Sequence, residues 1–218
     1  MNKTKAMDNF LATKIYALTA ENLSKGRSNL TIIDACIAAG IRFLQYREKN
    51  KSAREMYEEC LAIREKTARA GVTFIVNDHI DLALAVKADG VHIGQEDLPP
   101  QIVRELIGKD MVLGLSTHDP DQIKLAEKSG VVDYLGVGPV YATQTKVDVG
   151  EAVGLKYVTY AHEHTKLPFV AIGGIKEHNI HEVAKAGAKT IAVVSDIVGA
   201  VDIENKVQKL YQCMDIQV

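Results

Sequence analysis

Polar and positively charged side chains alternate along one short apolar segment of the chain. Gln45, Arg47 and Lys49 are spaced by two residues, and alternate residues of an extended chain share one side. Lys146 adds a further cation after a later segment. Side chains of these types could together bind a polyanion such as a diphosphate.

Two other apolar segments each end in acidic residues. One runs into Asn77-Asp78 and the other into Gln95-Glu96-Asp97. Two like charges about 4 Å apart repel by about 4 kcal/mol at an effective dielectric constant of about 20. A divalent ion turns that repulsion into attraction, and two such acids suit Mg²⁺ that also binds water and a substrate phosphate. The pattern predicts a magnesium-assisted anion site built on Asp78 and Asp97.

Glycine and serine after the last two apolar segments predict a second anion site. Gly173-Gly174 ends one segment and Val194-Ser195 ends the other. Backbone N–H groups in such positions often bind a phosphate group. The chain therefore offers two anion sites, one assisted by a metal and one made of backbone.

Each polar group also has a simpler structural interpretation. Asp97 could act only as a helix cap, and Asn77-Asp78 could only begin a helix with favourable dipole geometry. Arg47 and Lys49 could be solvated loop charges. All these groups follow apolar segments, so they could gather at one place in the fold. Cations and acids gathered together favour phosphate chemistry over separate structural roles.

The histidines are expected to have structural rather than catalytic roles. His92 alternates with Val91 and Ile93, which predicts a hydrogen-bonded histidine in the protein interior. His118 is expected in the first turn of a loop, with no assigned role. Four others are expected at the surface of helical segments, with no acids at metal-binding spacing: His162, His164, His178 and His181.

Eight short segments rich in β-branched residues are predicted to be strands: residues 14–20, 43–47, 73–77, 90–94, 111–117, 133–140, 168–174 and 190–195. Between them lie segments with helical periodicity, and the apolar positions of residues 53–70 form one helical stripe. Helices are predicted to end in glycines that adopt a left-handed cap and lead into the next strand: Gly40, Gly71, Gly90, Gly130 and Gly187. Asp97 and Asp119 precede prolines, as is typical of helix N-termini.

This alternation predicts an α/β fold: a single-domain (β/α)8 TIM barrel over residues 1–218, with residues 1–13 as an N-terminal extension or helix. An open doubly wound sheet is the alternative, although no Gly-x-Gly-x-x-Gly motif follows the first predicted strand. In a barrel the loops after the strands form the active face, where the polar groups described above would gather.

The composition narrows the function classes. Of 218 residues, 47% are hydrophobic and 25% are charged, and the net charge of −2 gives no support to nucleic-acid or membrane binding. The chain start has no segment typical of a signal peptide, and Cys36, Cys60 and Cys213 show no Cys-x-x-Cys spacing. We expect a cytoplasmic protein with reduced thiols. The oligomeric state stays open, with a homodimer as one expectation.

Six motifs along the chain carry a family resemblance. They are QYREK (45–49), IVNDHIDLALAVKADGVHIGQEDLP (75–99), GLSTH (114–118), YLGVGPVYATQTK (134–146), AIGGI (171–175) and VVS (193–195). The first two and the Thr-x-Thr-Lys element are specific in combination, whereas AIGGI alone occurs in many phosphate-binding barrels. On these motifs the chain resembles the thiamine-phosphate synthase family over nearly its whole length.

The resemblance implies a transferase of thiamine diphosphate biosynthesis. It would condense 4-amino-5-hydroxymethyl-2-methylpyrimidine diphosphate with 4-methyl-5-(2-phosphoethyl)thiazole, giving thiamine phosphate and pyrophosphate, with Mg²⁺ as cofactor. In the family, departure of the diphosphate leaves a pyrimidine-methyl cation, which the thiazole nitrogen captures. Such a dissociative displacement needs charge stabilisation and positioning rather than a strong enzymic nucleophile, and no such nucleophile is evident in this sequence.

By matched position, the resemblance implies a catalytic set of Arg47, Lys49, Ser116 and Lys146. The residues implied to bind the pyrimidine diphosphate are Gln45, Tyr46, Arg47, Glu48, Lys49, Asn77, Ser116 and Lys146. Those implied to bind the thiazole phosphate are Thr143, Gln144, Thr145, Gly174, Val194 and Ser195. Mg²⁺ would bind Asp78 and Asp97. Tyr46 stands where an aliphatic residue is usual and should point away from the site, and residues 142–152 should order over the substrates and exclude water.

Three alternatives stay open. The related thiazole tautomerase shares the fold and part of these motifs but needs no diphosphate leaving group. A non-catalytic sensor would bind a phosphorylated ligand without needing Lys146 and two acids. A sugar-phosphate isomerase or epimerase would need an acid or base at the substrate carbon, which this set of residues does not obviously supply.

Overall fold

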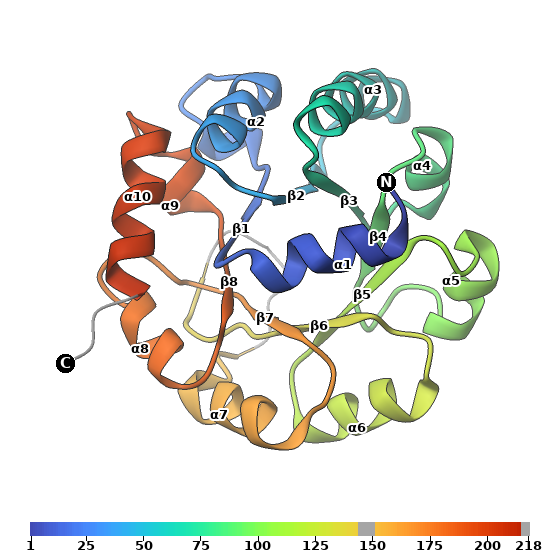
Figure 1. The fold of residues 1–218 in the computed structure, drawn as a ribbon, viewed down its shortest axis with the longest axis vertical. Coiled ribbons are helices and arrows are strands. Elements are labelled where there is room, and N and C mark those ends of the chain that lie inside the picture. The colour runs from blue at the N-terminus through green and yellow to red at the C-terminus, as the bar shows by residue number, and fades with distance from the viewer. Residues whose placement is uncertain (144–150, 215–218) are drawn as a thin grey trace.

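A closed barrel of parallel strands forms the centre of the molecule (Figure 1). The computed structural model describes residues 1–143 and 151–214, and within these ranges eight strands pair in sequence order. They are β1 Ile15–Leu18, β2 Phe43–Tyr46, β3 Thr73–Asn77, β4 Gly90–Ile93, β5 Val112–Thr117, β6 Tyr134–Val137, β7 Phe169–Ala171 and β8 Thr190–Val193. Pairing of β1 with β8 closes the ring. The predicted TIM barrel is confirmed.

Helices surround the barrel and connect successive strands (Figure 1). In the described residues they are α1 Lys3–Ala12, η1 Glu21–Leu23, α2 Asn29–Ala38, α3 Ala53–Ala70, α4 Ile80–Ala85, α5 Pro100–Ile107, α6 Pro120–Ser129, α7 Gly154–His164, α8 Ile180–Lys185, α9 Ser195–Val198 and α10 Ile203–Met214. None of these helices combines the length and apolar character needed to cross a membrane.

The helix α3 shows how local sequence sets an element's limits. Its capping box pairs Ser52 with Glu55, each side chain binding the other residue's backbone N–H. Gly71 ends the helix in the left-handed conformation, at φ 67°. The buried residues are Met56, Cys60, Ile63 and Thr67, so most of the predicted stripe packs on the barrel, whereas its apolar members Ala53 and Tyr57 are exposed.

Gly90 corrects one prediction about the helix ends. Positive φ angles occur at four of the five predicted cap glycines, which are Gly40, Gly71, Gly130 and Gly187. Gly90 instead begins β4, and a Cβ added there would lie 2.5 Å from the carbonyl oxygen of Val112. The residue with positive φ after α4 is Lys87, at 53°. Gly90 is therefore required by close contact with β5, and not by a helix cap.

The N-terminal helix closes one end of the barrel. Figure 1 shows α1 lying across the end from which the strands begin. Its Phe10 packs inside the barrel with ring centroids 5.1 Å from Phe43 and 4.7 Å from Tyr134. Because aromatic side chains fill this end, ligands must enter from the other, where the strands finish.

Candidate active site

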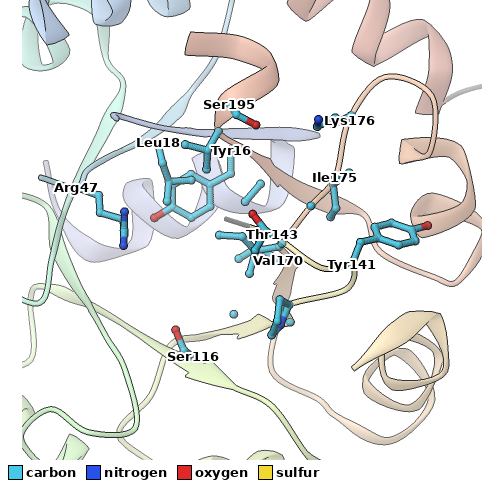
Figure 2. Close-up of a pocket in the computed structure, with 18 of the residues that line it drawn as sticks. Tyr16, Leu18, Arg47, Ser116, Tyr141, Thr143, Val170, Ile175, Lys176 and Ser195 are labelled. Atoms are coloured by element: carbon cyan, nitrogen blue, oxygen red, sulfur yellow. The ribbon is translucent and has the colours of Figure 1, made fainter. Parts of the chain in front are cut away.

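A cavity of about 970 Å³ lies at the carboxyl ends of the strands. Figure 2 shows Arg47, Ser116 and Ser195 around it, each from a different element. The cavity brings together eight of the residues predicted from sequence: Gln45, Arg47, Asn77, Ser116, Thr143, Gly174, Val194 and Ser195. Residues from β2, β3 and β5 thus share a hollow with residues that follow β6, β7 and β8.

Other predicted residues lie outside the cavity lining. The hydroxyl of Tyr46 donates a 2.7 Å hydrogen bond to Glu59, away from the cavity. The Glu48 carboxylate accepts hydrogen bonds from the backbone N–H of Glu21 and from the amide of Asn29. Lys49 is exposed. Gln144, Thr145 and Lys146 fall outside the described residues, as does most of the expected cover formed by residues 142–152.

Arg47 carries a buried nitrogen that no described residue satisfies. Its Nη2 has no hydrogen-bond partner in the described part of the chain. Burial lowers the pKa of the guanidinium, and the nearby carboxylates of Asp78 and Glu48 act in the opposite direction. Buried N–H groups are almost always paired, so one that lines a cavity indicates an anionic ligand.

The two predicted metal-binding acids follow neighbouring strands. Asp78 comes directly after β3 with a positive φ of 62°, and its N–H donates to the carbonyl of His92 in β4. Asp97 is exposed, and its carboxylate accepts a 2.7 Å hydrogen bond from the N–H of Gly94. Pro99 occupies the N-cap position of α5. Asp97 is therefore not the N-cap residue of that helix.

The donor set is compatible with Mg²⁺ shared between protein and ligand. Within the described ranges no group of three or more His, Cys, Asp and Glu side chains is placed to hold a metal ion. Mg²⁺ characteristically takes only one or two protein carboxylates and completes its shell with water and substrate phosphate. Asp78 and Asp97 follow the adjacent strands β3 and β4 and supply two carboxylates, the number that this mode of binding takes, although neither is among the residues that line the cavity.

His92 lies inside the barrel, directly below the cavity. Its Nδ1 is 2.9 Å from the hydroxyl of Tyr134, and its Nε2 is 2.9 Å from Oγ of Ser116. The side chain is buried, which confirms the predicted hydrogen-bonded interior histidine. His92 also lines the cavity floor, so it contacts both the core and the site.

Glycines let two loops approach each other beside the predicted phosphate site. A Cβ on Gly173 would lie 2.5 Å from Cα of Pro139. One on Gly174 would lie 2.8 Å from the carbonyl oxygen of Ala142. Both glycines have positive φ, 106° and 65°, which suits glycine above other residues. The loops after β6 and β7 can meet only because these positions lack side chains.

Several lining residues were not assigned by the sequence. His178, expected on a helix surface, lies in the turn before α8 and lines the cavity, together with Lys176. His118 also lines it, and its Nδ1 donates to the carbonyl of Gly138 at 2.5 Å. The position of Lys176 and His178 directly after the glycine pair was the available signal, since residues following a barrel strand face its mouth.

Comparison with known proteins identifies the family. A family model described as thiamine monophosphate synthase matches residues 15–197. A thiamine-phosphate synthase of Pelotomaculum thermopropionicum is 58% identical over 96% of each chain, and one of Caldicellulosiruptor saccharolyticus is 48% identical over 97% of this chain and 95% of its own. The solved structure of thiamine phosphate pyrophosphorylase from Pyrococcus furiosus superposes with a TM-score of 0.84 and 34% identity, covering 98% of this chain and 97% of its own. The chain belongs to the thiamine monophosphate synthase family.

Proposed function

We propose that the chain catalyses the Mg²⁺-dependent condensation of 4-amino-5-hydroxymethyl-2-methylpyrimidine diphosphate with 4-methyl-5-(2-phosphoethyl)thiazole, releasing pyrophosphate. Family membership supports the reaction class. The observation that carries the assignment of the diphosphate end is Nη2 of Arg47, which is buried and has no hydrogen-bond partner among the residues that the structure describes. A guanidinium held there can bind two phosphate oxygens in its planar fork.

The chemistry required of the protein is mainly electrostatic. Arg47 and Lys49 bind the diphosphate and stabilise the charge that grows on it as the bond to the pyrimidine methylene breaks. Ser116 lines the same cavity as Arg47, and in this proposal it contacts the pyrimidine near the reacting carbon. Asp78 and Asp97 would hold Mg²⁺, which when bound neutralises phosphate charge and orients the leaving group.

The second substrate occupies the side of the cavity formed by the last three strands. Thr143, the backbone around Gly174 and the Val194-Ser195 segment bind its phosphate. This arrangement points the thiazole ring toward the cavity floor, where Ser116 lies. Proximity then favours capture of the pyrimidine-methyl cation by the thiazole nitrogen over capture by water. Gln144, Thr145 and Lys146 belong to the same proposed contacts.

One assay separates this function from its alternatives. Purified protein is incubated with each heterocycle alone and with both, in Mg²⁺ and in chelator, while pyrophosphate and thiamine phosphate are quantified. The proposal requires both products to form only when both substrates and metal are present. Rearrangement of a thiazole phosphate alone would identify a tautomerase, and ligand binding without turnover would identify a sensor.

A further inference from the structure

A chain of hydrogen bonds crosses the floor of the cavity inside the barrel. It begins at Gln45 on β2, whose Nε2 lies 2.7 Å from the hydroxyl of Tyr16. That hydroxyl lies 3.1 Å from the hydroxyl of Tyr134 on β6, which lies 2.9 Å from Nδ1 of His92. His92 Nε2 then lies 2.9 Å from Oγ of Ser116 on β5. The chain thus joins two cavity-lining residues through three buried rings.

The donor at the first link favours one direction for the later hydrogen bonds. The amide nitrogen of Gln45 can only donate, so the Tyr16 oxygen accepts from it. If Tyr16 gives its one hydrogen to Tyr134, then Tyr134 can give its own hydrogen to Nδ1 of His92, and every hydrogen in the series has an acceptor. Burial raises the pKa of both tyrosines, so both keep these hydrogens. In this arrangement Nδ1 is an acceptor, and the imidazole hydrogen lies on Nε2.

The opposite tautomer would leave a buried hydrogen unpaired. If Nδ1 of His92 donated to Tyr134, then Tyr134 would donate to Tyr16. The Tyr16 oxygen would then accept from both Tyr134 and Gln45, and the hydrogen of Tyr16 would have no acceptor in this series of hydrogen bonds. A buried polar hydrogen without a partner costs about 1–3 kcal/mol.

The backbone around His92 holds the imidazole ring in place. Gly136 on β6 faces its edge, and a Cβ there would lie 3.2 Å from Cε1. On β5, a Cβ at Gly114 would overlap Nδ1 and the ring of Tyr134. Side chains at these positions would displace the ring. The space for these hydrogen bonds therefore depends on Gly114 in β5 and Gly136 in β6 as well as on the five residues that form the bonds.

We propose that His92 is a positioning residue that accepts from Tyr134 and donates to Ser116, so that the Ser116 hydroxyl presents its own hydrogen to the bound pyrimidine substrate. The identity of that ligand rests on the proposed function, whereas the direction of the hydrogen bonds does not. With its oxygen occupied by His92 Nε2–H, Ser116 can act toward the ligand as a donor. A donor suits an electron-rich pyrimidine nitrogen or diphosphate oxygen.

The direction of the chain can be measured directly by nitrogen-15 NMR of the histidine rings in the intact protein. The His92→Asn variant identifies the His92 signals among those of the seven histidines. We expect Nε2 to be protonated and Nδ1 to be unprotonated in the protein without ligand. In Tyr134→Phe, which removes the donor to Nδ1, the preference for this tautomer should weaken. Protonated Nδ1 with unprotonated Nε2 in the unaltered protein would overturn the proposal.

Kinetics then test the link to Ser116. Tyr134→Phe should lower kcat about 10-fold, equivalent to about 1.4 kcal/mol, and leave KM for the pyrimidine diphosphate within twofold. Tyr157→Phe is the matched control, because it removes a buried hydroxyl that donates to Asp119 outside the cavity. Equal kcat values for Tyr134→Phe and the unaltered protein would exclude the positioning role. Complete absence of synthase activity in the unaltered protein would instead reject the proposed function and leave the NMR result valid.

Discussion

Gly174 and Tyr141 face each other so closely that a Cβ on Gly174 would lie 2.8 Å from Cβ of Tyr141. This contact brings the loop after β7 against the loop after β6 beside the proposed thiazole phosphate site. Gly174→Ala should push the two loops apart and raise KM for the thiazole phosphate at least about 10-fold, because the lost backbone contacts act on a charged ligand. Steady-state kinetics with each substrate varied in turn measure this effect.

Gly130→Ala is the matched control for that substitution. Gly130 has nearly the same backbone conformation, with φ of 67° against 65°, but a Cβ there would have no heavy atom within 4 Å. It should therefore lose about 1 kcal/mol of stability from backbone strain and keep its KM. Equal KM changes in the two variants would show that strain, and not the loop contact, determines the effect.

Arg47 should not tolerate lysine. A lysine ammonium keeps the charge but cannot replace the planar fork of the guanidinium. Arg47→Lys should raise KM for the pyrimidine diphosphate about 10-fold, or about 1.4 kcal/mol, and lower kcat as well. Arg42→Lys is the control, since Arg42 is exposed at the opposite end of the same strand. Unchanged KM and kcat in Arg47→Lys would contradict the proposed binding of the diphosphate by Arg47.

Asp97→Asn should weaken metal dependence without disturbing the fold. An asparagine carbonyl can still accept the hydrogen bond from Gly94, while the charge that attracts Mg²⁺ is lost. We expect the Mg²⁺ concentration for half-maximal rate to rise about 10-fold. Asp81→Asn, on the exposed side of α4, should leave the Mg²⁺ titration unchanged. Superimposable titrations of Asp97→Asn and the unaltered protein would argue against a metal site at Asp97.

Much of the fold could be predicted because it depends on local patterns. The stripe over residues 53–70 predicted α3 with its bounds, since apolar periodicity and the capping residues agree there. The prediction for Gly90 was wrong because two kinds of glycine look the same in a sequence. One ends a helix with a positive φ, and the other begins a strand where the neighbouring strand leaves no room for a side chain. Only the pairing of β4 with β5 distinguishes the two cases.

The site was predictable where a residue ends a strand, as with Asn77 and Ser116, because barrel topology sends such residues to one rim. The site was less predictable where the position of a side chain depends on partners that are distant in sequence. Alternation placed His92 inside the barrel, but its contacts with Tyr134 and Ser116 join three strands that are distant in sequence. His178 was assigned to a helix surface because its neighbours have helical character, while the turn that precedes α8 depends on tertiary packing.

Glu127 provides a test of stability that is independent of the active site. Its carboxylate accepts hydrogen bonds from the N–H of Lys166, at 2.6 Å, and from the hydroxyl of Thr165, at 2.7 Å, and these bonds lower its pKa below the ordinary value of 4.5. A lowered folded-state pKa means that the stabilisation is complete above the unfolded-state pKa and is lost as pH falls through the folded-state value. Because this carboxylate is largely solvated and glutamine can still accept both hydrogen bonds, Glu127→Gln should reduce the free energy of unfolding by only about 0.5 kcal/mol at pH 7, and by progressively less as the pH falls below about 4.5. Urea unfolding across this range, with the exposed Glu163→Gln as control, measures the difference, and a deficit that stayed constant down to acid pH would contradict the assigned cause.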